Sequence, residues 1–380
     1  MGTSSSNSDY MVEGFGRWWN DPKKHYKRKN FWLPAAKSLK SRIGDSRPFR
    51  YFTLCAREMI DVFMLAKEGV LHYDSSTELV EHVRFCESNL EQYTEIMELI
   101  GEEGSGFFGR LEELILFKDD SYTAQFPDTG SLSMELEDQG LTKEAKTILQ
   151  KKTIHFHVKA SFPFDFINLD FCGYYYPHPP QVLEINDAVA RVLEWQKRES
   201  REDFGKLKVK EFIMSITCRH DQNIASEAEV RLTNVIKGNN RDYSRYRSFL
   251  QSKRGITDID QWVRNEKLDF FLSAWPKEIT RLAEDRNWKM EILAYLYYDR
   301  VDDEGLPYNI VCLVARFKPS RSSGHLANAL FVLDKRNHQF LEDIPRNSSQ
   351  WKALIADLRQ IRDLRNSQAR QKKRPELPPP

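Results

Sequence analysis

The sequence predicts an α/β protein with a doubly wound, mostly parallel sheet that ends in an antiparallel hairpin and carries helical insertions. Short apolar runs of strand length alternate with amphipathic helical stretches between about residues 48 and 275. This alternation requires parallel strands joined by crossover helices. Two further strands at 289–319 are joined by a DDEG-containing turn, which indicates an antiparallel pair.

Strands are predicted where apolar and β-branched residues run together for several positions. In chain order these are RYFTLCA (50–56), EHVRFCES (81–88), FDFINLDFCG (164–173) and EFIMSITCR (211–219). The run GFFGRLEELILF (106–117) is ambiguous between strand and helix. HFHVK (155–159) is interpreted as a strand with His155 and His157 on one face, as surface histidines or as a metal-binding pair.

Helices are predicted where apolar residues recur three and four positions apart. The clearest are REMIDVFMLAKEGV (57–70), SNLEQYTEIMELIGE (88–102), NDAVARVLEWQKRE (186–199) and a basic stretch near 349–368. Two polar segments, at about 120–150 and 224–265, break the alternation and are predicted to be helical insertions. The stretch KLDFFLSAWPKEITRLAEDRNW is predicted to be a helix interrupted or restarted near Pro276, because proline lacks the amide hydrogen of a helical bond.

Three regions are predicted along the 380 residues. They are a disordered start with a basic and aromatic extension (1–47), one large domain (48–318), and a basic, partly helical and partly disordered tail (319–380). The 57 basic and 56 acidic residues nearly cancel, so any attraction to nucleic acid must be local. No apolar stretch has the roughly 20 residues of a membrane span, and no signal peptide or CxxC spacing is visible, so we expect a cytoplasmic protein with free thiols and no membrane partner.

The run FPFDFINLDFCGYYYP (162–177) ends a predicted buried strand on an acid, a cysteine and a glycine. In a doubly wound sheet, ligands bind outside the carboxyl ends of the strands, where the strand order reverses. Asp170 therefore either contributes to a ligand site or simply terminates the strand. The tyrosines that follow either stack on a base or pack against the insertions.

Five or so strand–helix units closed by a helix and a hairpin resemble the class I S-adenosylmethionine (SAM)-dependent methyltransferases, a Rossmann-like superfamily, across about residues 48–318. The strand end LDFCG is similar to the DPFG or DPPY-type loop of methyltransferases that modify amino groups of nucleic acids. It also resembles the corresponding loop of the partner proteins of three-Cys-motif radical enzymes in bacterial gene clusters. The resemblance implies SAM as the cofactor and a nucleic-acid amino group as the methyl acceptor.

The resemblance assigns roles at three strand ends. The catalytic loop that holds the acceptor would consist of Asp170, Phe171, Cys172, Gly173 and Tyr174. The cofactor would contact Cys55 and Ala56 after the first strand, and Glu87 and Ser88 after the second, where a carboxylate can accept both ribose hydroxyls. The loop CAREMIDV lacks the glycine that the family has there, so Arg57 and Glu58 would fill space that relatives leave empty.

A second candidate site is the basic and aromatic stretch GFGRWWNDPKKHYKRKNFW (14–32). Its candidate nucleic-acid-binding residues are Trp18, Trp19, Lys23, Lys24, Lys27, Arg28 and Lys29. Cations neutralise phosphates and flat rings stack on bases, whereas the same residue types also suit docking on another protein subunit. The basic residues near the end of the chain also favour an anionic partner.

Four cysteines lie at the carboxyl ends of predicted strands: Cys55, Cys86, Cys172 and Cys218. Four thiolates could hold zinc or an iron–sulfur cluster, but cysteine is also a common small core residue, and we predict no metal site. Two functions stay open. The chain is either a SAM-dependent methyltransferase acting on nucleic acid or a catalytically degenerate binding or scaffolding subunit of a bacterial multi-protein complex, such as an antiviral defence system.

Overall fold

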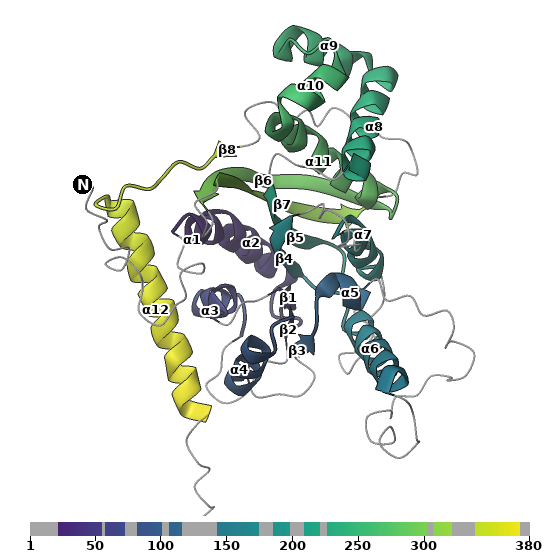
Figure 1. The fold of residues 1–380 in the computed structure, drawn as a ribbon. Coiled ribbons are helices and arrows are strands. Elements are labelled where there is room, and N and C mark those ends of the chain that lie inside the picture. The colour runs from purple at the N-terminus through teal and green to yellow at the C-terminus, as the bar shows by residue number, and fades with distance from the viewer. Residues whose placement is uncertain are drawn as a thin grey trace, which may run out of the picture.

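The computed structural model describes residues 22–54, 58–72, 82–100, 106–115, 143–174, 185–197, 209–220, 226–301, 307–320 and 339–372. An eight-stranded sheet lies at the centre with helices on both of its faces (Figure 1). The strand order is β3-β2-β1-β4-β5-β7-β6-β8. The predicted fold class, a Rossmann-like α/β sheet that ends in an antiparallel hairpin, is therefore confirmed.

The strands are β1 (Tyr51–Thr53), β2 (Val83–Glu87), β3 (Gly106–Phe108), β4 (Phe166–Tyr174), β5 (Phe212–His220), β6 (Trp288–Val301), β7 (Pro307–Pro319) and β8 (Gln339–Phe340). Strands β1 to β5 pair in parallel. Strand β7 lies between β5 and β6 and is antiparallel to both. The order runs outward from β1 to β3 in one direction and from β4 to β5 in the other, so the switch point lies between β1 and β4.

The helices are α1 (Pro22–Lys27), the π-helix η1 (Arg28–Trp32), α2 (Leu33–Ile43), α3 (Ile60–Lys67), α4 (Leu90–Ile100), α5 (Leu111–Ile115), α6 (Lys143–Ala160), α7 (Ile185–Trp195), α8 (Ser226–Asp242), α9 (Ser244–Arg254), α10 (Ile259–Asn265), α11 (Lys267–Glu284) and α12 (Ser349–Lys372). Helices α2, α3, α4 and α12 contribute to a first core on one face of the sheet. Helices α5, α7 and α11 contribute to a second core on the other face. The predicted insertion at 224–265 is helical, as α8 to α10, whereas most of the one at 120–150 lies outside the described residues.

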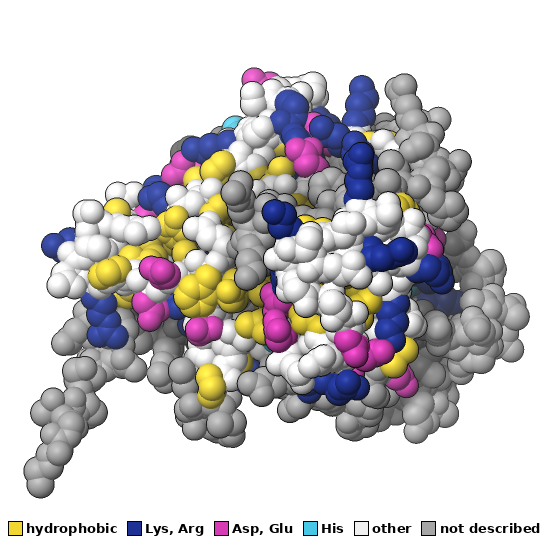
Figure 2. All heavy atoms as spheres, turned by 90° about the horizontal axis from the view of Figure 1, so that it is seen from above, with side chains coloured by type: hydrophobic (Ala, Val, Ile, Leu, Met, Phe, Trp, Pro, Cys, Tyr) yellow, Lys and Arg dark blue, Asp and Glu magenta, His cyan; other side chains and the backbone are white. Residues whose placement is uncertain are grey.

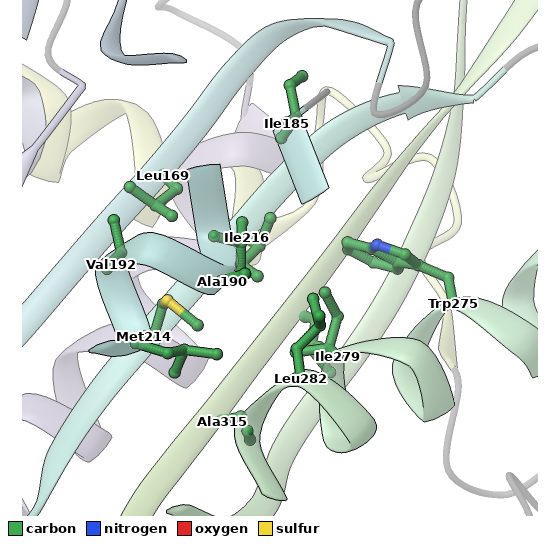
Figure 3. Close-up of a cluster of buried hydrophobic side chains, with 14 of the residues drawn as sticks. Leu169, Ile185, Ala190, Val192, Met214, Ile216, Trp275, Ile279, Leu282 and Ala315 are labelled. Carbon is green, nitrogen blue, oxygen red and sulfur yellow. The ribbon is translucent and has the colours of Figure 1, made fainter. Parts of the chain in front are cut away.

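Strand β4 shows how the alternating residues of one strand supply both cores. Phe166 belongs to the first core, and Ile167 and Leu169 belong to the second, because successive side chains of a strand point to opposite faces. Figure 3 shows Leu169 in the second core with Val192 of α7 and other buried aliphatic side chains. Each such side chain stabilises the fold by about 1.5–3 kcal/mol when it is fully buried.

Pro276 lies inside one continuous helix, α11, so the predicted interruption is wrong. A proline inside a helix costs about 3 kcal/mol, because it removes one backbone bond and crowds the preceding turn. The buried side chains of Phe271, Trp275 and Ile279 outweigh that cost by packing α11 in the second core. Thr280 Oγ1 also donates to the carbonyl of Pro276 at 2.8 Å.

The stretch HFHVK belongs to α6 and is not a strand. His155 and His157 therefore point about 200° apart around the helix axis, since each residue turns by about 100°. His155 Nδ1 lies 2.6 Å from the carbonyl oxygen of Leu114. Five residues with alternating His, Phe, His and Val cannot by themselves distinguish a strand from a helix, and here they lie near the end of an 18-residue helix. The ambiguous run from residue 106 forms β3 followed by α5.

Both ends of the described chain are part of the first core. Trp32 and Leu39 near the start are buried there together with Leu358 and Ile361 of α12. The boundaries predicted at residues 47 and 319 therefore separate segments that share one core. The helix predicted near 349–368 is confirmed as α12. Among the described residues, no helix is both long and apolar enough to cross a membrane.

Candidate functional site at the carboxyl ends of β1, β4 and β5

A row of polar residues lies across three neighbouring strands near the switch point. Thr53 of β1 pairs with Asn168 of β4, and Asp170 of β4 pairs with Thr217 of β5. Paired residues of adjacent strands share a face, and residues two apart on one strand do as well. All four side chains therefore point to the first-core face, beneath α1, η1 and α3.

Asp61 of α3 is a buried acid whose oxygens are bonded within the chain. Its Oδ2 accepts hydrogen bonds from Tyr51 Oη at 2.5 Å, Thr53 Oγ1 at 2.7 Å and Asn168 Nδ2 at 3.2 Å. Burial, together with the Asp61 carboxylate, holds the pKa of Tyr51 well above its ordinary value. These contacts join α3 to the switch point. Sequence reasoning missed Asp61, although a lone acid in the apolar helix IDVFMLA was a visible signal.

Asp170 forms a nearly buried ion pair with the N-terminal part of its own chain. Its Oδ2 lies 2.6 Å from Lys24 Nζ, and each side chain is 9% exposed. Burial alone would raise the pKa of Asp170, but the positive charges of Lys24, Lys27 and Arg28 outweigh it and lower the pKa to about 2. The acid is therefore ionised and already has a cationic partner.

Lys27 is fully buried beside Asp170. Its Nζ donates to Thr217 Oγ1 at 2.8 Å and lies 4.6 Å from the centre of the Trp32 ring. Burial lowers the pKa of Lys27, because the charged form loses its hydration. Thr217 in turn donates to Cys312 Sγ of β7 at 3.5 Å, so this thiol lies directly beneath the lysine.

Arg28 has buried guanidinium nitrogens, Nε and Nη1, that have no hydrogen-bond partner among the described residues. It helps to enclose a small cavity at the switch point, which we call the switch-point cavity. The lining residues are Arg28, Leu54, Glu58, Met59, Ile60, Asp61, Asn168 and Asp170. The cavity volume is about 10 Å³, which is the room that one water molecule needs.

Residues 22–32, which form α1 and η1, will be called the basic helical segment. Lys24, Lys27 and Arg28 are spaced i, i+3 and i+4, so they share the face that meets the sheet. His25 and Lys29 are four apart and share another face, toward α12. This spacing is readable in the sequence, but the inward direction of the three cations is not.

On its outer face the basic helical segment contacts Asp357 of α12. Asp357 Oδ2 lies 2.8 Å from His25 Nε2 and 3.5 Å from Lys29 Nζ, and Oδ1 accepts from Lys67 of α3. Burial opposes ionisation of Asp357, but the hydrogen bonds from His25 and Lys67 hold its pKa well below the ordinary value. One carboxylate thus connects α12 to α1, η1 and α3.

Of the four residues predicted to bind the cofactor, the two that the structure describes, Glu87 and Ser88, do not line the switch-point cavity. Glu87 is half-buried at the end of β2, where its carboxylate accepts from the backbone amide of Asn89 at 2.7 Å. Burial raises the pKa of Glu87. Cys55 and Ala56 lie outside the described residues.

The predicted catalytic loop continues β4 beyond Asp170. The pairing of β4 with β5 is irregular between Asp170 and Tyr174, and Phe171 is buried in the second core, away from Asp170. The backbone of Cys172 and Gly173 belongs to the strand, whereas their side-chain surroundings and that of Tyr174 lie outside the description. Only Asp170 of this loop is thus placed by its side chain at the switch point.

Three of the candidate nucleic-acid-binding residues face the interior of the fold and not solvent. Lys24, Lys27 and Arg28 are buried against the sheet, so they cannot contact a phosphate while the segment is in place. Lys29 has a 40% exposed side chain, and Lys23 pairs with Asp343 at 2.5 Å. Trp18 and Trp19 lie outside the described residues. The physical reason is that Asp170 and Thr217 supply polar partners inside the fold.

The three cysteines within the described part of the chain, Cys86, Cys218 and Cys312, are buried. Cys218 belongs to the second core and Cys312 to the first, on opposite faces of the sheet. In the same part of the chain, no three His, Cys, Asp or Glu side chains are grouped so that they could hold a metal ion. The predicted convergence of four strand-end thiols involves Cys55 and Cys172, whose side chains are not described.

No protein-family model matches this chain, and no curated protein has a matching sequence.

Proposed function

We propose that the chain is a methyltransferase-like binding subunit that does not transfer methyl groups. The proposal depends above all on the Lys24–Asp170 ion pair of 2.6 Å. The resemblance implies that Asp170 binds the amino group of the methyl acceptor. In this structure the ammonium group of Lys24 already occupies that position beside Asp170. Removing one partner of a buried ion pair costs about 3–5 kcal/mol, so an acceptor amine would have to displace Lys24 at a similar cost.

The size of the switch-point cavity supports the same proposal. Pockets that bind cofactors and drug-sized molecules measure about 300–1,000 Å³, whereas this cavity measures about 10 Å³. The side chains of Arg28 and Glu58 are among those that line it. Glu58 comes from the loop that lacks the family's glycine, so its place at the cavity agrees with the crowding predicted from CAREMIDV.

The strand order supports the methyltransferase-like part of the proposal. The sheet reverses its order between β1 and β4 and carries the antiparallel β6–β7 hairpin beyond β5, as the resemblance implies. The partner class, other protein subunits of a bacterial multi-protein complex such as a defence system, follows from the resemblance to partner proteins of radical enzymes. On the face shown in Figure 2, basic side chains lie scattered among acidic and hydrophobic ones, so that face is not a uniform surface for nucleic acid.

One observation favours a second candidate function, SAM-dependent methylation of a nucleic-acid amino group. Glu87 lies at the end of β2, where the cofactor ribose would bind, and its orientation is fixed by the Asn89 amide. In this candidate the basic helical segment leaves the sheet before the cofactor enters. The conformation described here is then the closed state of the enzyme.

Calorimetric titration with SAM separates the two functions. We expect no binding heat and no rise in the thermal midpoint at millimolar SAM, because a ligand stabilises the native state only if it binds it. Methyl transfer from labelled SAM to mixed DNA, RNA or protein is expected to be absent in parallel. Micromolar SAM binding that is weakened by Glu87→Ala would overturn the binding-subunit proposal and support the enzyme.

The binding role has its own test. A tagged copy expressed at its native level in the source cell is purified gently, and the eluate is cross-linked and analysed by mass spectrometry. We expect a stoichiometric protein partner with defined cross-links to this chain. A chain that elutes as a monomer without a stoichiometric partner contradicts the proposal.

A further inference from the structure

We propose that α12 controls access to the switch point by holding the basic helical segment against the sheet through Asp357. Loss of the Asp357 charge then releases residues 22–32 and uncovers Asp170 of β4, Thr217 of β5 and Cys312 of β7 on the first-core face of the sheet. This inference goes beyond the proposed function, because it concerns how the site opens and is independent of what binds there.

The basic helical segment is the first half of one helix that continues without a break through η1 into α2, from residue 22 to residue 43. The end of a helix frays unless contacts hold it. The position of the segment therefore depends on its contacts with the rest of the chain. These contacts come from the sheet, from α12, and from Asp343 ahead of α12, which pairs with Lys23 at 2.5 Å.

The contacts on the sheet side are incomplete. Lys24 pairs with Asp170 and Trp32 packs edge-on against Phe166 with ring centres 6.0 Å apart. Lys27, in contrast, donates to a neutral hydroxyl, and two guanidinium nitrogens of Arg28 have no partner among the described residues. Buried charges and donors without full compensation oppose burial. The cations on the sheet side thus oppose burial of the segment, whereas Trp32, which has no exposed surface, favours it.

The contacts on the α12 side converge on a single carboxylate. Asp357 is 7% exposed and contacts His25, Lys29 and Lys67, which come from α1, η1 and α3. If the carboxylate becomes neutral, two ammonium groups lose their shared counter-charge. The attraction between α12 and the segment is then replaced by repulsion between Lys29 and Lys67.

Two native thiols can report the opening, so no cysteine has to be introduced. Cys312 lies below Thr217 and Lys27 on the first-core face. Cys218 is on the neighbouring strand β5 but belongs to the second core, so it stays covered when only the segment leaves. Maleimide labelling followed by peptide mass spectrometry gives a rate for each thiol. Hydrogen exchange of the peptide that spans 22–32 reports the same opening at the backbone.

The test compares Asp357→Asn with Asp363→Asn in the full chain. Asp363 is an exposed acid on the same helix and pairs with its neighbour Arg362 at 2.9 Å. We expect Asp357→Asn to speed labelling of Cys312 and exchange of 22–32 by about tenfold or more, since hydrogen bonds to charged groups contribute about 1.5–3 kcal/mol. Cys218 labelling is expected to stay slow, and Asp363→Asn is expected to match the wild type.

Two outcomes overturn the proposal. In the first, Cys312 labelling stays at the wild-type rate in Asp357→Asn. In the second, Cys312 and Cys218 accelerate together, which shows that the segment opens only with the whole fold. If Asp357→Asn yields no folded protein, Lys29→Met is examined in the same way, because it removes only the 3.5 Å contact at the rim. An unchanged Cys312 rate in that variant also overturns the proposal.

Discussion

Lys27 has no exposed surface, although lysine is almost never fully buried unless it is paired. Its ammonium group lies between the Thr217 hydroxyl and the Trp32 ring, near the Asp170 charge. The neighbouring Lys24 takes the carboxylate directly. Asp170 is thus the residue on which the burial of these cations depends, and it is the first residue to test.

Replacing Asp170 by Asn is expected to destabilise the chain by about 3–5 kcal/mol, because it leaves Lys24 as an uncompensated buried charge. The pKa of Asp170 falls from 3.8 to about 2 on folding, so its contribution is complete above 3.8 and is lost as the pH falls to 2. This shift of the pKa lowers the free energy of unfolding of the wild type by about 2 kcal/mol when the pH falls from 5 to 2.

Urea unfolding at several pH values measures both effects of Asp170→Asn. The variant is expected to lack the part of the acid destabilisation that comes from this carboxyl. Asp363→Asn serves as the control, because its side chain is 66% exposed. A variant as stable as the wild type at pH 7 contradicts the assignment of a stabilising ion pair at the switch point.

At the scale of single elements, β4 is held by buried polar contacts at its amino end as well as at Asp170. Asp165, which immediately precedes β4, is fully buried. It accepts two hydrogen bonds from Arg47, at 2.6 and 2.5 Å, and one from the backbone amide of Arg50 at 2.9 Å. The Arg50 guanidinium donates to the carbonyl oxygens of Ser161 and Pro163. The segment before β1 and the segment before β4 are thereby joined where the two strands begin.

Asp165→Ala is expected to lower the free energy of unfolding by about 3–5 kcal/mol, since it leaves a guanidinium without its buried counter-charge. Glu291→Ala is the matched control, because Glu291 pairs with Arg316 in β7 but is 50% exposed. A surface pair of this kind contributes at most about 1 kcal/mol. Equal effects of the two substitutions in urea unfolding would contradict the role given to Asp165.

At the scale of the whole molecule, the sequence predicted the sheet well and the terminal segments poorly. The strands were visible because buried parallel strands are continuous apolar runs, as in FINLD, and the hairpin because its turn is short. The burial of Lys24 and Lys27 was not visible, because their partners Asp170 and Thr217 lie far along the chain. Asp170 lies within β4, four residues before its end, although the sequence predicted it as the end of the strand. Its pairing with Lys24 was not predicted.

The C-terminal helix α12 is part of the core of the domain. Leu354, Ile355, Leu358 and Ile361 of α12 are buried in the fold. Four such side chains contribute about 6–12 kcal/mol, which is comparable with the whole stability of a typical domain, about 5–15 kcal/mol.

A chain that stops after residue 348 is therefore expected not to fold, whereas one that stops after residue 372 keeps α12 and is expected to unfold cooperatively in urea. Circular dichroism and urea titration of the two chains measure the difference. If the shorter chain unfolds at the same urea concentration as the longer one, α12 is an appendage to the domain. Because α12 also carries Asp357, that result would leave the basic helical segment without its outer support in a chain that is still folded. The labelling of Cys312 in that chain would then show directly whether the sheet side alone holds the segment.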